Sequence, residues 1–357
     1  MTPAGIGVVG CGVAAVDICR AIDALPGARL AAAHDRVEAL AVDLAAPRGA
    51  AVYASLEGLL ADPVVEVVYV GLPHDLLAPV AARAIATGHH VYVEKPAGLD
   101  AASIERLGAL AAARGVILGV VFEFRAAAAV REARRLVAGG AIGEVRGVRI
   151  RTIIDKPATY WRTGPCDRIA DDWRSRKARA GGGVVLMNAI HQLDIVRFVT
   201  GLPVVRVVAD VATLAAPAGV EVEDTGAAVL RLGNGALASL TATAHSPGAE
   251  REERIEIDGA LGRLDLPDPY GPGALRLFLR QPWDDLPAGT WLERAADGID
   301  EHVASLAALL DAVRTGSTPL ATGVDAAAAL ATVTAIYESA AAGRAVDVTF
   351  EEDQHDA

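Results

Sequence analysis

The stretch from Gly5 to Ile22 (GIGVVGCGVAAVDICRAI) constrains the fold of this chain more than any other. A short apolar run, Ile6 to Val9, is broken by Gly10-Cys11-Gly12, and an apolar helical pattern begins at Val13. This order predicts a strand, a tight turn and a helix. Gly10 permits the sharp turn, and Gly12, which has no Cβ, lets a ligand approach the backbone closely.

The same turn is typical of a dinucleotide-binding site. Its third small residue is Ala15, as the pattern G-x-G-x-x-G/A allows, and the N–H groups that open such a helix bind a pyrophosphate. A second apolar run ends at Asp35, 23 residues after Gly12, where an acid for the adenosine ribose is expected. We therefore favour a dinucleotide site over the alternative, an ordinary turn between a strand and a helix.

The residues after the second apolar run bear on the choice between NAD and NADP. A carboxylate beside a 2′-phosphate costs on the order of 4 kcal/mol for a charge pair at ~4 Å and an effective dielectric of ~20. Asp35 therefore favours NAD, whereas Arg36 could offset the repulsion by pairing with the phosphate. We expect NAD as the cofactor and keep NADP as the alternative.

Apolar runs and helical patterns alternate through the first third of the chain, which is typical of a parallel sheet with crossover helices. We predict a doubly wound Rossmann domain over residues 1–122. Its expected strands are Ile6 to Val9, Arg29 to His34, Ala51 to Tyr53, Val67 to Gly71, His90 to Glu94 and Val116 to Val120.

The character of the sequence changes from Gly143 onward. Alternating runs predict an open, mainly antiparallel sheet in an α+β domain over residues 123–357, with Asn234-Gly235 as a hairpin turn. Helices are expected from Val184 to Thr200, Asp300 to Thr315 and Val324 to Ala342. If they cover one face of the sheet, the other face needs a cover, so we expect a homo-oligomer, a dimer or a tetramer, formed through that face.

Composition excludes several classes of partner. The net charge of −12 disfavours nucleic acid and anionic membranes. The apolar stretches are broken well before the ~20 residues of a membrane span, and no basic segment typical of a signal peptide precedes the first strand. Cys11, Cys19 and Cys166 have no metal-binding spacing. We expect a soluble, cytoplasmic protein that binds a small molecule and no metal.

Two segments carry groups suited to proton transfer. Glu94-Lys95-Pro96 stands at the end of the fifth predicted strand, where ligands bind in such sheets. Gly181-Gly182-Gly183 precedes a predicted helix on which Met187, His191 and Asp194 share one face. Imidazole suits proton transfer near neutral pH. The competing interpretations are a solvated lysine and a structural histidine.

These motifs, in this order, resemble the glucose–fructose oxidoreductase/inositol dehydrogenase (Gfo/Idh/MocA) family. The resemblance runs nearly end to end and includes Glu223-Asp224-Thr225 before a strand and Arg314-Thr315-Gly316 in the closing helix pair. It implies NAD(P)-dependent oxidation or reduction of a sugar, a cyclitol or a similar secondary alcohol. The family's EKP lysine corresponds to Lys95 and its catalytic histidine to His191.

The chain also departs from the family pattern. Many members carry an aspartate one helical turn before the histidine, where this chain has Met187 with Asn188 beside it. A thioether cannot relay a proton, so Lys95 and His191 would share the proton transfer, or the chemistry differs from polyol oxidation. In the loop Gly71 to His74, Leu72 stands where members often have threonine. The expected cofactor-binding residues are Gly10, Gly12, Val13, Ala14, Ala15, Asp35, Arg36, Leu72, Pro73, His74, Glu94 and Lys95.

Aromatic and charged residues could line a substrate pocket. A guanidinium can bind a hydroxyl, a carboxylate or a phosphate, and aromatic faces suit a polyhydroxylated ring or an aromatic diol. The expected substrate-binding residues are Arg125, Tyr160, Trp161, Trp173, Asn188 and His191. A network of ion pairs in a surface loop is an equally good interpretation of the segment that holds the aromatic residues.

We expect an NAD(P)-dependent oxidoreductase that transfers hydride between nicotinamide and a secondary alcohol or ketone of a sugar, cyclitol or related diol. His191 is expected to accept or donate the proton, while Lys95 hydrogen-bonds the reacting oxygen. Two alternatives stay open. One is an NAD-dependent glycosidase that oxidises its substrate transiently, and the other is a catalytically inactive sensor or scaffold that binds NAD.

Overall fold

The structure, a computed structural model, describes residues 2–164, 168, 171–248, 251–269, 271, 273–295 and 298–350. Cys166 lies outside these residues, while Cys11 and Cys19 are free and buried. Contacts group the chain into two compact units, the first with Met1–Glu123, Thr159–Gly181 and Asp300–Ala327 and the second with Phe124–Ala158, Gly182–Ile299 and Ala328–Ala357. The units are not continuous in the chain. The boundary expected between residues 122 and 123 stays a prediction for the domains as such.

The first unit is built on a six-stranded parallel sheet with the order β3-β2-β1-β4-β5-β6. This order reverses at β1, as in a doubly wound nucleotide-binding fold, and confirms the predicted Rossmann architecture. Val67 to Val70 are all buried, as expected of a strand covered on both faces. The strands are β1 (Ala4–Val9), β2 (Ala28–His34), β3 (Ala51–Val52), β4 (Val67–Val70), β5 (His90–Glu94) and β6 (Leu118–Val121).

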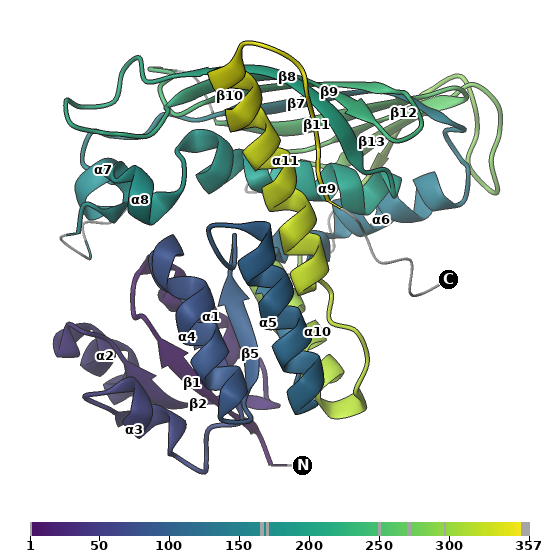
Figure 1. The fold of residues 1–357 in the computed structure, drawn as a ribbon. Helices are drawn as coiled ribbons and strands as arrows, with labels where there is room; N and C mark the ends of the chain where they lie inside the picture. Colours follow the sequence, from purple (N-terminus) through teal and green to yellow (C-terminus); the bar gives the residue numbers. More distant parts are fainter. Residues whose placement is uncertain are drawn as a thin grey trace. The chain divides into compact units, whose positions relative to one another are not determined.

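Helices of this unit also pack against one another. Helix α1 packs against α10, and α4 packs against α5 (Figure 1). The core between α1 and the sheet includes Ile18, Ile22 and, from α10, Leu306 and Leu309. The helices are α1 (Val13–Ala24), α2 (Glu38–Ala45), α3 (Leu56–Leu60), α4 (His74–Ala86), α5 (Ala101–Arg114), α7 (Tyr160–Thr163), α8 (Lys177–Ala180) and α10 (Glu301–Thr315).

The second unit holds a nine-stranded sheet with the order β14-β13-β12-β11-β7-β10-β9-β8-β15. All pairs are antiparallel except β7 with β10, which confirms the predicted mainly antiparallel sheet. The alternating runs that predict this sheet end with Arg254 to Asp258, so the four strands that follow Gly259 in the chain were not expected from the sequence. The strands are β7 (Val145–Ile153), β8 (Val204–Ala212), β9 (Thr225–Leu232), β10 (Leu237–Thr243), β11 (Glu252–Gly259), β12 (Gly262–Leu266), β13 (Leu275–Leu279), β14 (Trp291–Arg294) and β15 (Val346–Asp347).

One face of this sheet carries helices α6 (Ala128–Ala138) and α9 (Ile190–Thr200), which also pack against each other (Figure 1). The strands alternate accordingly: in β10, every second side chain is buried beneath the helices. The outer face leaves large apolar side chains in solvent, with Val208 52%, Val229 50% and Leu237 48% exposed. Helix α11 (Gly323–Ala342) closes the fold, and its residues from Ala328 belong to this unit.

Within the described part of the chain, none of the helices combines the length and the apolar character needed to cross a membrane.

Candidate active site

The predicted phosphate-binding turn lies between β1 and α1 in the first unit. Gly10 has φ +87°, and a Cβ there would stand 2.3 Å from the carbonyl oxygen of Gly71, so only glycine fits. Gly12 caps α1 without any side-chain hydrogen bond, and the first helical turn holds no acidic residue. Val13 and Ala14 open the helix, and Ala15 is buried against the sheet. The positive end of α1 is thus left for an anion.

Asp35 follows β2, and two backbone N–H groups hold its carboxylate. Cys11 N donates to Oδ2 at 2.7 Å and Val37 N donates to Oδ1 at 2.8 Å. A carboxylate has about four acceptor positions, so both oxygens keep lone pairs for a ribose hydroxyl. The hydrogen bond from Cys11 N thereby joins the turn directly to the acid.

The segment Thr159–Gly181 belongs to the first unit and contacts the phosphate-binding turn. Arg168 donates from Nε to the carbonyl oxygen of Cys11 at 3.0 Å and pairs with Asp43 at 2.8 Å. Asp171 accepts from Arg36. Sequence reasoning expected this segment to contact the substrate and missed its contacts with the cofactor loops, because nothing local marks a contact with residues more than 130 positions away.

The loop after β4 leads into α4 at His74, where Pro73 is the N-cap. The His74 ring is buried, contacts the carbonyl oxygen of Ala180 through Nδ1 at 2.7 Å, and packs against Trp173 with ring centroids 4.8 Å apart. Burial, with a smaller contribution from the positive charge of Lys95, lowers the pKa of His74 to about 3. His74 is therefore neutral at physiological pH. Leu72 lies just before Pro73 and is half-buried.

Glu94 and Lys95 end β5 and are both half-buried. The Tyr69 hydroxyl donates to Glu94 Oε1 at 2.9 Å. Burial raises the pKa of Glu94, and the positive charge of Lys95 opposes the rise. Lys95 thus acts electrostatically on both Glu94 and His74. The Lys95–Pro96 peptide is cis.

Glu123 is a further titratable group near Lys95 to which the sequence gave no role. It follows β6, and its side chain is 5% exposed. The pKa of Glu123 is raised to about 7, mainly by burial and to a smaller extent by the charge of Glu94, while His302 and Lys95 oppose the rise. A carboxyl group that titrates near neutral pH is typical of a functional site. The signal that could have identified Glu123 was its place shortly after the strand predicted to end at Val120.

In the second unit the helix that carries His191 does not begin as the expected α-helix. Residues Val185–Ala189 form a π-helical turn, and α9 starts only at Ile190. The π turn changes the spacing on which the expected common face of Met187 and His191 rests, because it holds more residues than an α turn, so that face stays a prediction. Such turns are frequent at functional sites. Asn188 lies in the π turn and is half-buried.

His191 is 5% exposed and packs against Phe124, with ring centroids 4.9 Å apart. Below it, the next residue, Gln192, is fully buried and donates from Nε2 to Glu253 at 2.8 Å, while Thr152 donates to its Oε1 at 3.2 Å. These contacts fix the helix on the sheet beside the histidine. Sequence reasoning missed them because Gln192 and Glu253 are 61 positions apart.

The guanidinium of Arg125 was expected to bind substrate, but it is engaged with another side chain of the protein. Its Nε and Nη2 donate to the two carboxylate oxygens of Asp194 at 2.8 and 2.6 Å, and both side chains are buried. Its guanidinium carbon also lies 4.8 Å from the centre of the Phe198 ring. The bidentate face that was expected to bind substrate is therefore occupied by Asp194. The pair joins the segment after β6 to α9.

The triple glycine precedes the helical segment of His191, and backbone N–H groups at this point donate to a buried carboxylate. Glu223 accepts from Gly183 N at 2.7 Å, from Val185 N at 3.0 Å and from the Tyr337 hydroxyl at 2.8 Å. A Cβ at position 183 would lie 1.7 Å from the carbonyl oxygen of Glu223, and one at position 182 would lie 2.0 Å from the Tyr337 oxygen. The glycines here make room for the protein's own chain. Burial raises the pKa of Glu223, and the hydrogen bonds oppose the rise.

The aromatic residues expected to bind substrate are gathered in the first unit. Tyr160 and Trp161 are 7% and 3% exposed and pack edge to face, with centroids 5.3 Å apart. The guanidinium carbon of Arg174 lies 4.5 Å from the Trp173 ring centre and 5.4 Å from that of Tyr160. Tyr160 and Trp161 are thus largely committed to packing, while Trp173 is half-buried beside His74.

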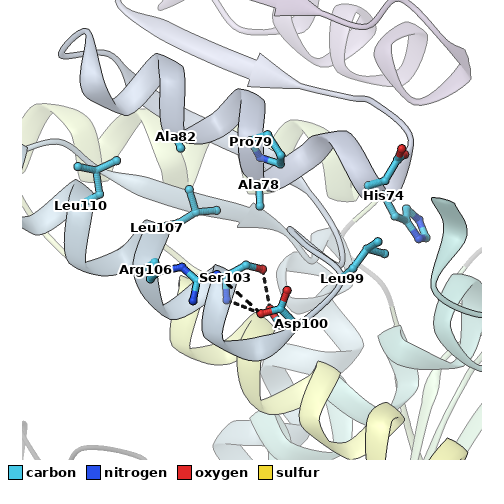
Figure 2. A pocket seen from close by; sticks show the side chains of 11 residues that line it. His74, Ala78, Pro79, Ala82, Leu99, Asp100, Ser103, Arg106, Leu107 and Leu110 are labelled. Atoms are coloured by element: carbon cyan, nitrogen blue, oxygen red, sulfur yellow. Dashed lines mark hydrogen bonds and ion pairs between the residues drawn. The ribbon is translucent and has the colours of Figure 1, made fainter. Parts of the chain in front are cut away.

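A groove lies between α4 and α5, and His74 stands at one end of it (Figure 2). Its floor is apolar, with Ala78, Pro79 and Leu107. One of its polar residues, Asp100, caps α5, because Ser103 N donates to Asp100 Oδ1 at 2.7 Å. Apart from His74 at one end, the residues that line the groove include no pair of side chains suited to proton transfer.

The first unit fits a dinucleotide cofactor. The uncapped start of α1 and the Asp35 carboxylate have been described, and a third observation agrees with them. Arg168 Nη2 is buried and has no hydrogen-bond partner among the described residues, so it can donate to an anionic group at the turn. No group of three or more histidine, cysteine or acidic side chains within the described residues is arranged to hold a metal.

Comparisons with known proteins agree with this geometry. Residues 4–122 match the family model described as "Oxidoreductase family, NAD-binding Rossmann fold", and residues 130–265 match the "GFO/IDH/MocA C-terminal domain". The 1,5-anhydro-D-fructose reductase of Ensifer adhaerens is 29% identical over 303 residues, which cover 82% of this chain and 83% of the relative.

Solved structures are similar over almost the whole chain. GenD2 from gentamicin A biosynthesis, solved in complex with NAD, is 29% identical with a TM-score of 0.83, covering 98% of this chain and 97% of its own. Levoglucosan dehydrogenase in complex with NADH shares the fold at 22% identity with a TM-score of 0.87, covering 98% of this chain and 100% of its own. The chain therefore belongs to the Gfo/Idh/MocA family of oxidoreductases, and its N-terminal part is an NAD-binding Rossmann domain.

Proposed function

We propose that this protein transfers hydride between NAD and a secondary alcohol or ketone of a sugar, a cyclitol or a related diol. The observation that carries the proposal is the open start of α1 at Gly12, joined to the Asp35 carboxylate through Cys11 N. The named activities of relatives support the substrate class, because they include a 1,5-anhydro-D-fructose reductase and trans-1,2-dihydrobenzene-1,2-diol dehydrogenases.

Each group of residues has its own role in binding the cofactor or in the reaction. Backbone N–H groups at Gly12 and the first turn of α1 hold the pyrophosphate, and Asp35 accepts from the ribose hydroxyls. The nicotinamide ring, when bound, accepts or returns the hydride. Lys95 hydrogen-bonds the reacting oxygen and stabilises the negative charge that develops on it.

His191 takes the hydroxyl proton during oxidation and returns it during reduction. Met187 cannot share this task, because a thioether neither accepts nor donates a proton at physiological pH. The Phe124 ring against His191 and the Gln192–Glu253 contact restrict the motion of the imidazole and its helix. The structural contacts of Arg125 leave Asn188 and Trp173 as the better candidates for contacting substrate.

The test is turnover on a panel of sugars, cyclitols and diols, followed by NADH absorbance. Lys95→Ala and His191→Ala are each expected to lower kcat about 10²- to 10⁴-fold, with the Kd for NAD within about threefold of the wild type. Lys177→Ala and His245→Ala, at exposed positions, are the matched controls and should keep activity.

Near-normal turnover in both active-site variants would contradict the assigned roles. Release of a sugar without any change in absorbance would select the NAD-dependent glycosidase instead. Binding of NAD with no turnover on any substrate would select the sensor or scaffold.

We further propose a homo-oligomer, a dimer or a tetramer, in the cytoplasm. Its support is the outer face of the nine-stranded sheet, where Val208, Val229 and Leu237 are about half exposed. Light scattering at micromolar concentration should give a multiple of the 36.7 kDa chain mass, and Val229→Glu should lower it. A monomer in the wild type would contradict the proposal.

A further inference from the structure

Asp171 forms two ion pairs in the first unit. Its Oδ2 accepts from Arg36 Nη2 at 2.6 Å, and its Oδ1 pairs with Arg179 Nη1 at 2.7 Å. The Asp171 side chain is 8% exposed, whereas Arg36 is 69% exposed. The acid is thus the fixed partner, and the flexible arginine is the one held.

The fixed position of Asp171 has a structural cause. Its backbone N–H donates to the Arg162 carbonyl at 3.0 Å, and its Oδ1 accepts from Trp173 N at 2.9 Å. The Trp173 ring packs in turn on His74, the first residue of α4. The carboxylate is therefore held by its own segment, which packs on the start of α4 through Trp173.

Arg36 is the residue on which recognition of a 2′-phosphate would depend. It follows Asp35, the acid placed for the adenosine ribose, and a guanidinium there can bind a phosphate bidentately. In this structure Arg36 Nη2 donates to Asp171. Asp35 cannot move aside easily either, since Cys11 N and Val37 N both hold its carboxylate.

We propose that Asp171 determines cofactor specificity by holding Arg36 away from the ribose, so that the site accepts the 2′-hydroxyl of NAD and disfavours the 2′-phosphate of NADP. The inference rests on the proposed function, because it assumes that the glycine turn and Asp35 bind a nicotinamide dinucleotide. The inference adds Asp171 to the residues that determine cofactor binding. This acid lies 135 positions from Arg36 and outside the nucleotide-binding motif.

The experiment measures Kd for NAD and for NADP by titration calorimetry, independently of turnover. Asp171→Asn keeps an oxygen to accept from Trp173 N but removes the charge that holds Arg36. It should tighten NADP binding about five- to tenfold and leave the NAD Kd within about threefold. Asp172→Asn is the matched control, because this substitution removes the same charge one residue away. In the wild type, Asp172 pairs with Arg176. It should change both constants less than twofold.

Two further variants identify Arg36 as the group released. Arg36→Ala alone should leave the NADP Kd unchanged, since Arg36 is already engaged in the wild type. Combined with Asp171→Asn, it should abolish the gain in NADP binding. The single arginine variant tests the proposal even if Asp171→Asn folds poorly, because a loss of NADP binding there would mean that Arg36 already binds the phosphate.

The outcomes separate this inference from the function on which it rests. A wild type that binds neither dinucleotide overturns the proposed function itself. A wild type that binds NAD, with equal gains in NADP binding for Asp171→Asn and Asp172→Asn, overturns only the role of Asp171. A gain that persists without Arg36, or a wild type that prefers NADP, overturns it as well.

Discussion

Two glycine-rich helix starts in this protein look alike in sequence and differ in what faces them. At Gly10-Cys11-Gly12 the helix α1 begins with no side-chain cap and no acid in its first turn. At Gly181-Gly182-Gly183 the N–H groups of residues 183 and 185 donate to the buried carboxylate of Glu223. One helix end is left for an anionic ligand, and the other is closed by the protein's own anion.

The difference shows that a run of glycines indicates a place where another group comes close to the backbone, but does not indicate whether that group is a ligand or part of the protein. The steric evidence is of the same kind at both turns, since a Cβ at position 10 or at position 183 would meet a carbonyl oxygen at 2.3 or 1.7 Å. What distinguishes them is the acceptor at the helix end. At the first turn that acceptor has to be a ligand, and at the second it is Glu223, held by Tyr337.

The largest effect is expected for Gly183→Ala. The added methyl meets the backbone of Glu223, which cannot move away as a side chain could, so the free energy of unfolding should fall by about 3 kcal/mol or more. Urea denaturation measures the loss. Gly108→Ala, in α5 with no atom within 4 Å of the new Cβ, is the control and should be neutral or slightly stabilising. Equal stability of the two variants would mean that the second turn is not closed as described.

A smaller loss of stability, joined to a loss of cofactor binding, is expected for Gly10→Ala. An L residue in the left-handed region costs about 1–2 kcal/mol, and the contact with the Gly71 carbonyl displaces the turn. The NAD Kd should rise at least about tenfold, because the N–H groups of α1 lose their alignment. Calorimetry measures it, with Gly27→Ala, which has open space around the new Cβ, as the control. Unchanged NAD binding would remove the functional half of the comparison.

The smallest effect is a pH dependence that Glu223→Gln should remove. Because the folded pKa of Glu223 is raised by burial, the stabilisation tied to its protonated form is complete below the unfolded value of 4.5 and is lost as pH rises through the folded pKa. The stability advantage of the wild type over Glu223→Gln should therefore shrink as pH rises from about 4 upward. Chemical denaturation across pH measures it, with the exposed Glu221→Gln as control. An advantage that grows with pH would show that the hydrogen bonds outweigh burial.

Much of the fold could be predicted from local pattern. The strand, turn and helix at Gly10, the six parallel strands and the mainly antiparallel second sheet follow from the spacing of apolar residues and from the position of glycines. The strands after Asp258 were missed. They are short, and some alternate arginine or acid with leucine, as at Gly262–Leu266, which weakens the apolar signal. The π turn at Val185–Ala189 was missed because no residue pattern distinguishes it from an α turn.

The site was predicted unevenly for the same reason. Residues that act through the backbone or from a strand end, such as Gly12 and Asp35, are found where the motif places them. Arg125 was expected to face a substrate, and it is paired with Asp194 instead. Residue type predicts what a guanidinium can bind, but not which carboxylate the folded chain brings to it.

The sequence by itself determined where many strands, turns and helices form, because the spacing of apolar residues and the positions of glycines act over neighbouring positions. The tertiary structure alone decided which distant polar and charged side chains meet. Asp171 reaches Arg36 across 135 positions, and Tyr337 reaches Glu223 across 114. Such pairs depend on the path of the whole chain, which no local pattern records. They decide which helix end stays open and which arginine is held.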